Sequence, residues 1–206
     1  MGDLRNEILG HRSLYLPWAH PKPRHDLAPE LARLLASQHG ATLTVVAPTL
    51  SAVPDELSRY DSITERSSRR VPDGGVVLVY APTRKLEPKF VRLRSSVVLV
   101  VECPSVSYEG WARLVGAYNI ATRSRMNSGL TEKGIEALEH VMFHGYKGWH
   151  DAMAVRATTE RLHELQDIGQ YDREVVLAYA RRERGEERIK RLYPLLDGFE
   201  RTRAGV

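Results

Sequence analysis

Residues 97–101 read Val-Val-Leu-Val-Val, so all five are aliphatic and four are β-branched. A run with no polar residue to face water predicts a strand covered on both faces, which is a central strand of a sheet. Residues 76–80, Val-Val-Leu-Val-Tyr, have the same character. We therefore expect a sheet built around these two strands, in which they pair either antiparallel or within a doubly wound parallel arrangement.

The flanking segments complete a layered pattern. Residues 13–18 and 41–46 are typical of strands, and residues 27–35 repeat leucine at helical spacing. Residues 90–94 alternate apolar and basic side chains, as an edge strand does, and residues 108–118 place large apolar side chains on one helix face. The first ten residues are predicted to be a polar lead-in, and Asp26 is predicted to cap the first helix of the sheet region.

The pattern changes near residue 122. A small, polar segment precedes three predicted helices, at 131–144, 151–168 and 172–196, and residues 181–191 are charge-dense and predicted to be solvated. The fold class is thus α/β, with a mixed central sheet flanked by helices and followed by an all-helical C-terminal region. We expect an α/β domain over residues 1–122 and a helical region over 130–206.

Composition narrows the class of protein. The 206 residues are 42% hydrophobic, enough for a core, and the single cysteine excludes a disulfide scaffold. There are 30 basic and 26 acidic residues, a net charge of +4, which is compatible with a polyanionic partner. No apolar run is long enough to span a membrane and the N-terminus has no apolar signal core, so we expect a cytoplasmic protein without a membrane partner.

Two carboxylates flank the predicted central strands. Asp73 lies in a turn just before the strand at 76–80, and Glu102 directly follows the strand at 97–101. If the strands place them at one end of the sheet, the pair suits a hard divalent cation such as Mg²⁺, which activates water and stabilises phosphodiester charge. In the simpler interpretation, Asp73 is an ordinary turn residue and Glu102 only marks the end of its strand.

The segment 66–94 is strongly basic. It holds eight basic and two acidic residues, an excess of six positive charges, which is more than the excess of the whole chain. Such a surface is typical of phosphate binding, although charged edge strands also protect a sheet from aggregation. The predicted nucleic-acid contacts are Arg66, Arg69, Arg70, Arg84, Lys85, Lys89, Arg92 and Arg94, with Arg113 on the next helix.

These residues resemble a known family. Pro72-Asp73, the aliphatic strand ending in Glu102, and the helix after it are similar to the PD-(D/E)XK nuclease core. His25-Asp26-Leu27-Ala28 and Thr64-Glu65-Arg66 resemble the degenerate cores of actinobacterial replication-relaxation proteins. The resemblance covers about residues 24–120.

The family resemblance implies DNA binding and a plasmid or phage setting. It implies catalytic carboxylates at Asp73 and Glu102, with Glu65 as a third ligand for Mg²⁺. Pro104 stands where active members carry a lysine. The resemblance therefore leaves two cases open: a core that still hydrolyses phosphodiesters with Mg²⁺, and, favoured by Pro104, a degenerate core that only binds DNA.

The leading hypothesis is therefore a nucleic-acid-binding protein with a degenerate nuclease-like core. The alternative is a non-catalytic structural or protein-interaction module that uses its C-terminal helices to bind a partner or a second copy of the chain. The apolar cluster at residues 192–196 is the feature that favours this alternative.

Overall fold

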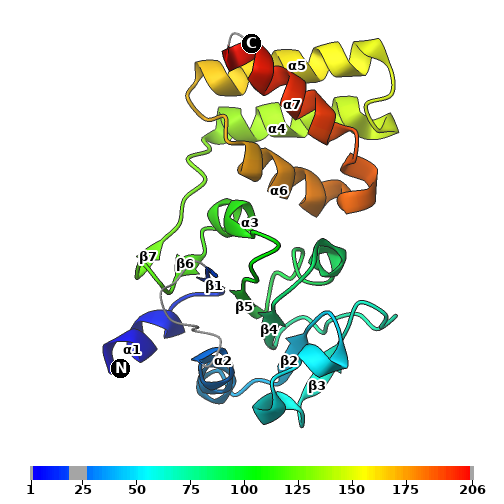
Figure 1. Cartoon of the computed structure of the whole chain (residues 1–206). Coiled ribbons are helices and arrows are strands. Elements are labelled where there is room, and N and C mark those ends of the chain that lie inside the picture. The colour runs from blue at the N-terminus through cyan, green and yellow to red at the C-terminus, as the bar shows by residue number, and fades with distance from the viewer. Residues whose placement is uncertain (1, 19–26, 205–206) are drawn as a thin grey trace. The chain divides into compact units, whose positions relative to one another are not determined.

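The computed structural model describes residues 2–18 and 27–204. The chain forms two compact units, Met1–Asn127 and Ser128–Val206. The division falls inside the polar segment that follows residue 122 in the sequence. The first unit is the predicted α/β layer and the second is entirely helical, as Figure 1 shows.

The α/β unit contains a seven-stranded mixed sheet in the order β3-β2-β4-β5-β1-β6-β7. All neighbouring strands are parallel except β6 and β7, which are antiparallel. The two aliphatic runs are adjacent, central and parallel, which decides between the two arrangements left open by the sequence. The strands are β1 Ser13–Leu16, β2 Leu43–Val46, β3 Asp61–Ile63, β4 Val76–Tyr80, β5 Val97–Val101, β6 Tyr118–Asn119 and β7 Ser124–Arg125.

Helices cover both faces of this sheet (Figure 1), which is why the central strands are apolar throughout. Alternate residues such as Leu78 and Leu99 join one core with Leu31 and Leu35 of α2 (Leu27–Gln38). On the other face lies α3 (Glu109–Leu114), whose Trp111 packs edge-on against another aromatic ring. The described residues of this unit also form the 3₁₀ turns η2 (Leu50–Ala52), η3 (Asp55–Leu57) and η4 (Arg84–Lys89).

Three predictions for the α/β unit are wrong. The helix predicted over residues 108–118 ends at Leu114, and Tyr118 begins β6. The first residues form a helix, α1 (Gly2–Leu9), because Ile8 is fully buried in the core under the sheet. Residues 90–94 are turn rather than strand, since Phe90 turns inward to pack between aromatic rings and its N–H bonds back to the carbonyl of Glu87. The predicted cap at Asp26 and the motif residue His25 lie outside the described residues.

The helical unit contains four helices among its described residues. They are α4 (Glu132–His144), α5 (Ala152–Asp167), α6 (Arg173–Arg184) and α7 (Leu192–Ala204), with 3₁₀ turns η5 (Gly145–Lys147) and η6 (Glu186–Ile189). Asp151 and Asp172 cap α5 and α6 with their carboxylates, which satisfies N–H groups of the first turn.

The predicted helix 172–196 is interrupted. Gly185, with φ of 79°, ends α6 because this conformation is unfavourable for any residue with a Cβ. Leu192 and Leu196 are fully buried, so the apolar cluster predicted to bind a partner packs largely inside the unit itself. No helix in the described part of the chain is both long and apolar enough to cross a membrane.

Candidate nucleic-acid interface

Glu102 is buried at the end of the sheet where the parallel strands finish. Both oxygens of its carboxylate accept hydrogen bonds from other residues of the unit. Oε1 accepts hydrogen bonds from the Tyr15 hydroxyl at 2.7 Å and the Tyr108 N–H at 2.6 Å, and Oε2 accepts from the Trp18 N–H at 3.1 Å. Burial and the bond to Glu102 raise the pKa of Tyr15 far above its usual range, so this hydroxyl stays a donor. Glu102 thus joins the loops that follow β1 and β5.

Asp73 precedes β4, so it lies at the opposite end of the sheet, where the parallel strands begin. Its Oδ1 accepts from the Ser96 hydroxyl at 2.8 Å and from the N–H of Ser95 at 3.0 Å. Together with two further N–H donors, these bonds lower the pKa of Asp73, the Ser96 hydroxyl most. Asp73 therefore ties the start of β4 to the start of β5.

The predicted carboxylate pair at Asp73 and Glu102 does not form. Ser96, which binds Asp73, is six residues before Glu102 along one extended strand, a span of about 20 Å. Two ligands of one Mg²⁺ ion must each lie about 2.1 Å from it. The prediction failed because β4 and β5 run parallel. Asp73 precedes β4 and Glu102 follows β5, so the two carboxylates lie at opposite ends of the sheet.

Glu65, the third predicted ligand, does lie at the C-terminal edge, but it accepts a hydrogen bond from the Thr83 hydroxyl. Among the described residues no three His, Cys, Asp or Glu side chains come close enough together to hold a metal. These positions therefore do not fit the predicted magnesium site, and no hydrolytic step is derived from them.

Several of the basic side chains that were predicted to bind phosphates instead form hydrogen bonds or ion pairs with nearby residues. Arg69 binds both oxygens of Asp61 at 2.6 and 2.8 Å, and Lys89 donates to the Ser67 carbonyl at 2.7 Å. Arg84 is partly buried and donates to the Ser107 carbonyl at 2.6 Å. Arg113 pairs with the glutamate one helical turn before it at 2.5 Å. The remaining members of this set are exposed, as is Arg69: they are Arg66, Arg70, Lys85, Arg92 and Arg94.

A more concentrated group of cations lines a cavity of about 380 Å³ in the helical unit. Its Glu187 pairs with Lys190 at 2.7 Å. In the described part of the chain, no carboxylate oxygen lies within 4.0 Å of the charged nitrogens of Lys147, Arg188 or Arg191. We call this the cationic cavity, and its charged residues are Lys147, Arg184, Arg188, Lys190, Arg191 and Glu187.

One wall of the cationic cavity is the turn after α4, which Trp149 holds in place. Trp149 is buried, and its Nε1 donates to the Thr158 hydroxyl at 3.0 Å. Its φ of 57° is rare for a bulky residue, and such strain persists only where the surroundings enforce it. A Cβ on Gly145 would lie 2.0 Å from the indole ring, so only glycine fits there. The turn is therefore rigid and presents Tyr146 and Lys147 outward.

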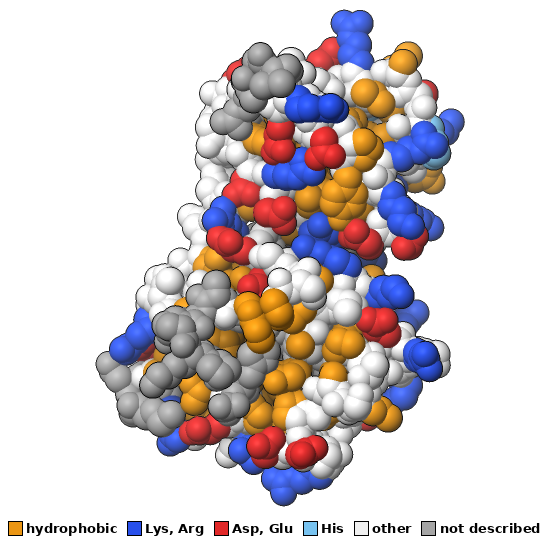
Figure 2. All heavy atoms as spheres, viewed as in Figure 1, with side chains coloured by type: hydrophobic (Ala, Val, Ile, Leu, Met, Phe, Trp, Pro, Cys, Tyr) orange, Lys and Arg blue, Asp and Glu red, His pale blue; other side chains and the backbone are white. Residues whose placement is uncertain are grey.

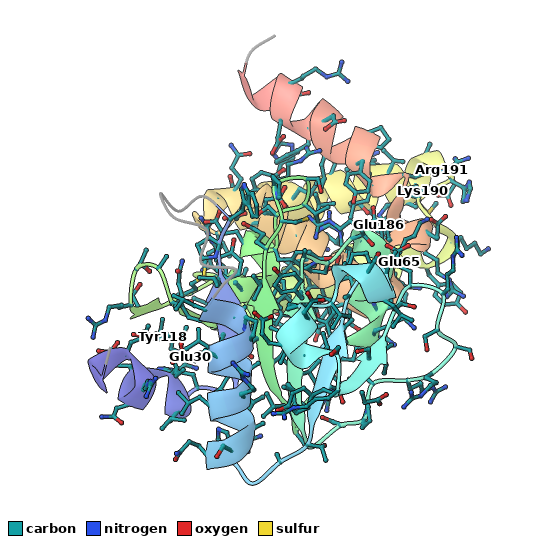
Figure 3. The ribbon with its side chains drawn as sticks, turned by 60° about the horizontal axis from the view of Figure 1, so that its bottom comes forward. Glu30, Glu65, Tyr118, Glu186, Lys190 and Arg191 are labelled. Atoms are coloured by element: carbon teal, nitrogen blue, oxygen red, sulfur yellow. The ribbon has the colours of Figure 1, made fainter. Side chains whose placement is uncertain are left out.

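The other wall is the segment between α6 and α7. The buried Arg181 donates to Glu186 at 2.9 Å and to the Tyr193 hydroxyl at 2.8 Å, and that hydroxyl donates to Glu186 at 2.7 Å. This network fixes the segment from which Lys190 and Arg191 extend, and Figure 3 shows these two residues together.

Arg184 connects the two walls. It donates to the Met142 carbonyl at 2.8 Å, near the end of α4. Its guanidinium also lies 5.2 Å from the centre of the Tyr146 ring, within the range of a cation–π contact. A cation and an aromatic ring are thus held together at the border of the cavity.

Basic and acidic side chains are intermingled on the face of the helical unit that Figure 2 shows. One example is Arg173, which pairs with Asp197 at 2.5 Å and Glu200 at 2.9 Å. The cationic cavity lacks this balance. Sequence reasoning missed it because Lys147 is far from the charge-dense segment in the chain, and the residues of that segment had been predicted to be solvated.

Comparisons with known proteins do not identify a relationship. No family model matches the chain, and neither a curated protein nor a solved structure matches it.

Proposed function

We propose that this protein binds nucleic acid without cleaving it, holding backbone phosphates in the cationic cavity of the helical unit. The observation that carries the proposal is the set of three cations, Lys147, Arg188 and Arg191, that no described carboxylate neutralises within 4.0 Å. Cations gathered without counter-charges repel one another, and a polyanion relieves that repulsion. Phosphate groups supply such charge at regular spacing along a strand.

The walls of the cavity support this function because they are preorganised. The buried Trp149 fixes one wall and the buried Arg181 fixes the other. Side chains presented from rigid elements lose less entropy on binding than side chains of mobile loops. The exposed arginines of the 66–94 segment, including Arg66 and Arg70, remain predicted secondary contacts.

The separation of the two carboxylates supports binding without cleavage. A metal-assisted reaction needs oxygen ligands that converge on one ion, and Asp73 and Glu102 each serve a different edge of the sheet. The resemblance to degenerate PD-(D/E)XK cores and the plasmid or phage setting stay predictions. Incubation of labelled DNA with Mn²⁺ should give binding and no products on a denaturing gel, whereas products that require Asp73 would overturn the non-catalytic part of the proposal.

The salt dependence of binding tests the phosphate contacts. If three cations each neutralise one phosphate, the logarithm of the binding constant should fall against the logarithm of the salt concentration with a slope of about −2 to −3. The measurement is fluorescence anisotropy of a labelled oligonucleotide at several salt concentrations. Arg188→Ala should make the slope shallower by about one.

Arg156→Ala is the matched control. Arg156 is also an arginine of the helical unit, is highly exposed and pairs with Glu160 outside the cavity. It should leave both affinity and slope unchanged. Equal effects of the two variants would mean that overall charge rather than the cavity is responsible, and no binding by the wild type would overturn the proposal.

A further inference from the structure

The cationic cavity adjoins a second cavity of about 520 Å³ that is also lined by Arg184 and Arg188. The second cavity is lined by residues of α4 and α6, among them Phe143, and its other charged side chains are Arg182, Glu139 and Glu183. The two cavities are therefore neighbours that share two lining residues, and we call them the paired cavities.

Each of the paired cavities has an exposed aromatic ring. Phe143 and Tyr146 are both 75% exposed, whereas the core aromatic residues Trp149 and Phe199 are buried. Large rings left in water beside a concave, charged surface are typical of binding sites rather than of solvated faces. Arg184 contacts the Tyr146 ring through its guanidinium, 5.2 Å from the ring centre. The exposure of Tyr146 leaves most of the ring open to a ligand.

The chemistry of these rings selects one form of nucleic acid. In a duplex the bases stack on one another, and a protein ring can stack only on a base that is free of its neighbour. In a single strand the bases are accessible, and aromatic side chains interleaved with cations form a stacking platform that tolerates any sequence. Phe143 and Tyr146, with Arg188 shared between the cavities, provide these two elements.

We propose that the paired cavities bind single-stranded nucleic acid, with bases stacked on Tyr146 and Phe143 and phosphates bound by Arg188 and its cationic neighbours. This inference rests on the proposed function and adds the class of substrate. Removal of a stacking ring should weaken single-strand binding by at least about fivefold. Duplex binding through phosphates alone should not change on the same substitution.

The test is fluorescence anisotropy with a labelled oligothymidine and with a duplex of equal length, competed by inorganic polyphosphate, which has no bases. Tyr146→Ala should weaken binding of the oligothymidine at least about fivefold and leave duplex binding unchanged. Tyr146→Phe is the matched control, because it keeps the ring and should bind like the wild type. Polyphosphate should compete equally against wild type and Tyr146→Ala for the duplex.

The outcomes separate the two proposals. Equal affinity for single strand and duplex, with no effect of Tyr146→Ala, would overturn the single-strand inference while the proposed function stands. No binding of either nucleic acid would overturn both. A single-strand preference that survives both Tyr146→Ala and Phe143→Leu would also contradict stacking on these rings.

Discussion

The packing of Trp149 against Gly145 can be tested by adding one methyl group, in the variant Gly145→Ala. In Gly145→Ala the new Cβ would lie 2.0 Å from the indole ring, whereas an ordinary contact begins at 3.4 Å, so the ring must retreat by 1.4 Å. The backbone of Gly145 has φ of −77°, which alanine adopts without strain. The steric contact is therefore the whole cause of the expected effect.

Two effects set the expected loss of stability in Gly145→Ala. Overpacking a well-filled site costs about 1–3 kcal/mol. Retreat of the ring also breaks the hydrogen bond from Trp149 Nε1 to Thr158, and a buried donor left without its partner costs about 1–3 kcal/mol. We expect about 3 kcal/mol of destabilisation in total, after the smaller entropic gain of replacing glycine. For a unit of this size that lowers the melting temperature by at least about 12 °C.

Gly198→Ala is the matched control. Gly198 lies within α7, and a Cβ there would meet nothing within 4 Å. Alanine is the better helix former, so this variant should gain about 0.5–1 kcal/mol. Thermal unfolding followed by far-ultraviolet circular dichroism measures both variants. The reasoning is refuted if Gly145→Ala melts at or above the wild-type temperature, or if the two variants shift in the same direction.

Two further predictions concern the α/β unit, and urea unfolding checks both. Glu102→Ala leaves three neutral donors without an acceptor. A buried donor left unsatisfied costs about 1–3 kcal/mol, so we expect a loss of about 3–5 kcal/mol. Glu102→Gln keeps an acceptor oxygen and should cost less, and equal losses would contradict this role of Glu102. Hydrogen bonds from Arg123 and Tyr118 lower the pKa of Glu7 from 4.5 to about 2. A carboxyl group whose pKa is lower in the folded than in the unfolded state stabilises the fold at pH values above its unfolded-state pKa. This stabilisation is lost as the pH falls through the folded-state pKa. Stability should therefore fall between pH 4.5 and 2, and Glu7→Gln should flatten this dependence; an unchanged pH dependence would show that the pairing contributes nothing.

Local patterns in the sequence predicted most of the secondary structure. The aliphatic runs 76–80 and 97–101 form the two central strands because helices and turns cover both of their faces. The helices at 132–144 and 152–167 follow their apolar periodicity, and Asp151 begins the second as a cap. Each of these features depends on neighbours within a few residues, so a sequence alone carries it.

Predictions that depend on distant residues were less successful. Whether Asp73 and Glu102 meet depends on the direction of strand pairing, which their own segments do not encode. Charge counting pointed to residues 66–94, but it does not show whether a cation has a carboxylate partner. Arg69 binds Asp61, whereas Arg188 has no carboxylate within 4.0 Å among the residues that the structure describes. The cationic cavity required the fold, because Lys147 and Arg188 are brought together only by the packing of the helices.

Charge reversal inside the cationic cavity shows whether nucleic acid binds there. The measurement is the anisotropy of a labelled oligothymidine titrated with wild type, with the double variant Arg188→Glu/Arg191→Glu, and with Arg156→Glu as a single-charge control outside the cavity. We predict salt-sensitive binding by the wild type and by Arg156→Glu, and loss of binding by the double variant with its melting temperature unchanged. Undiminished binding by the folded double variant would contradict the account.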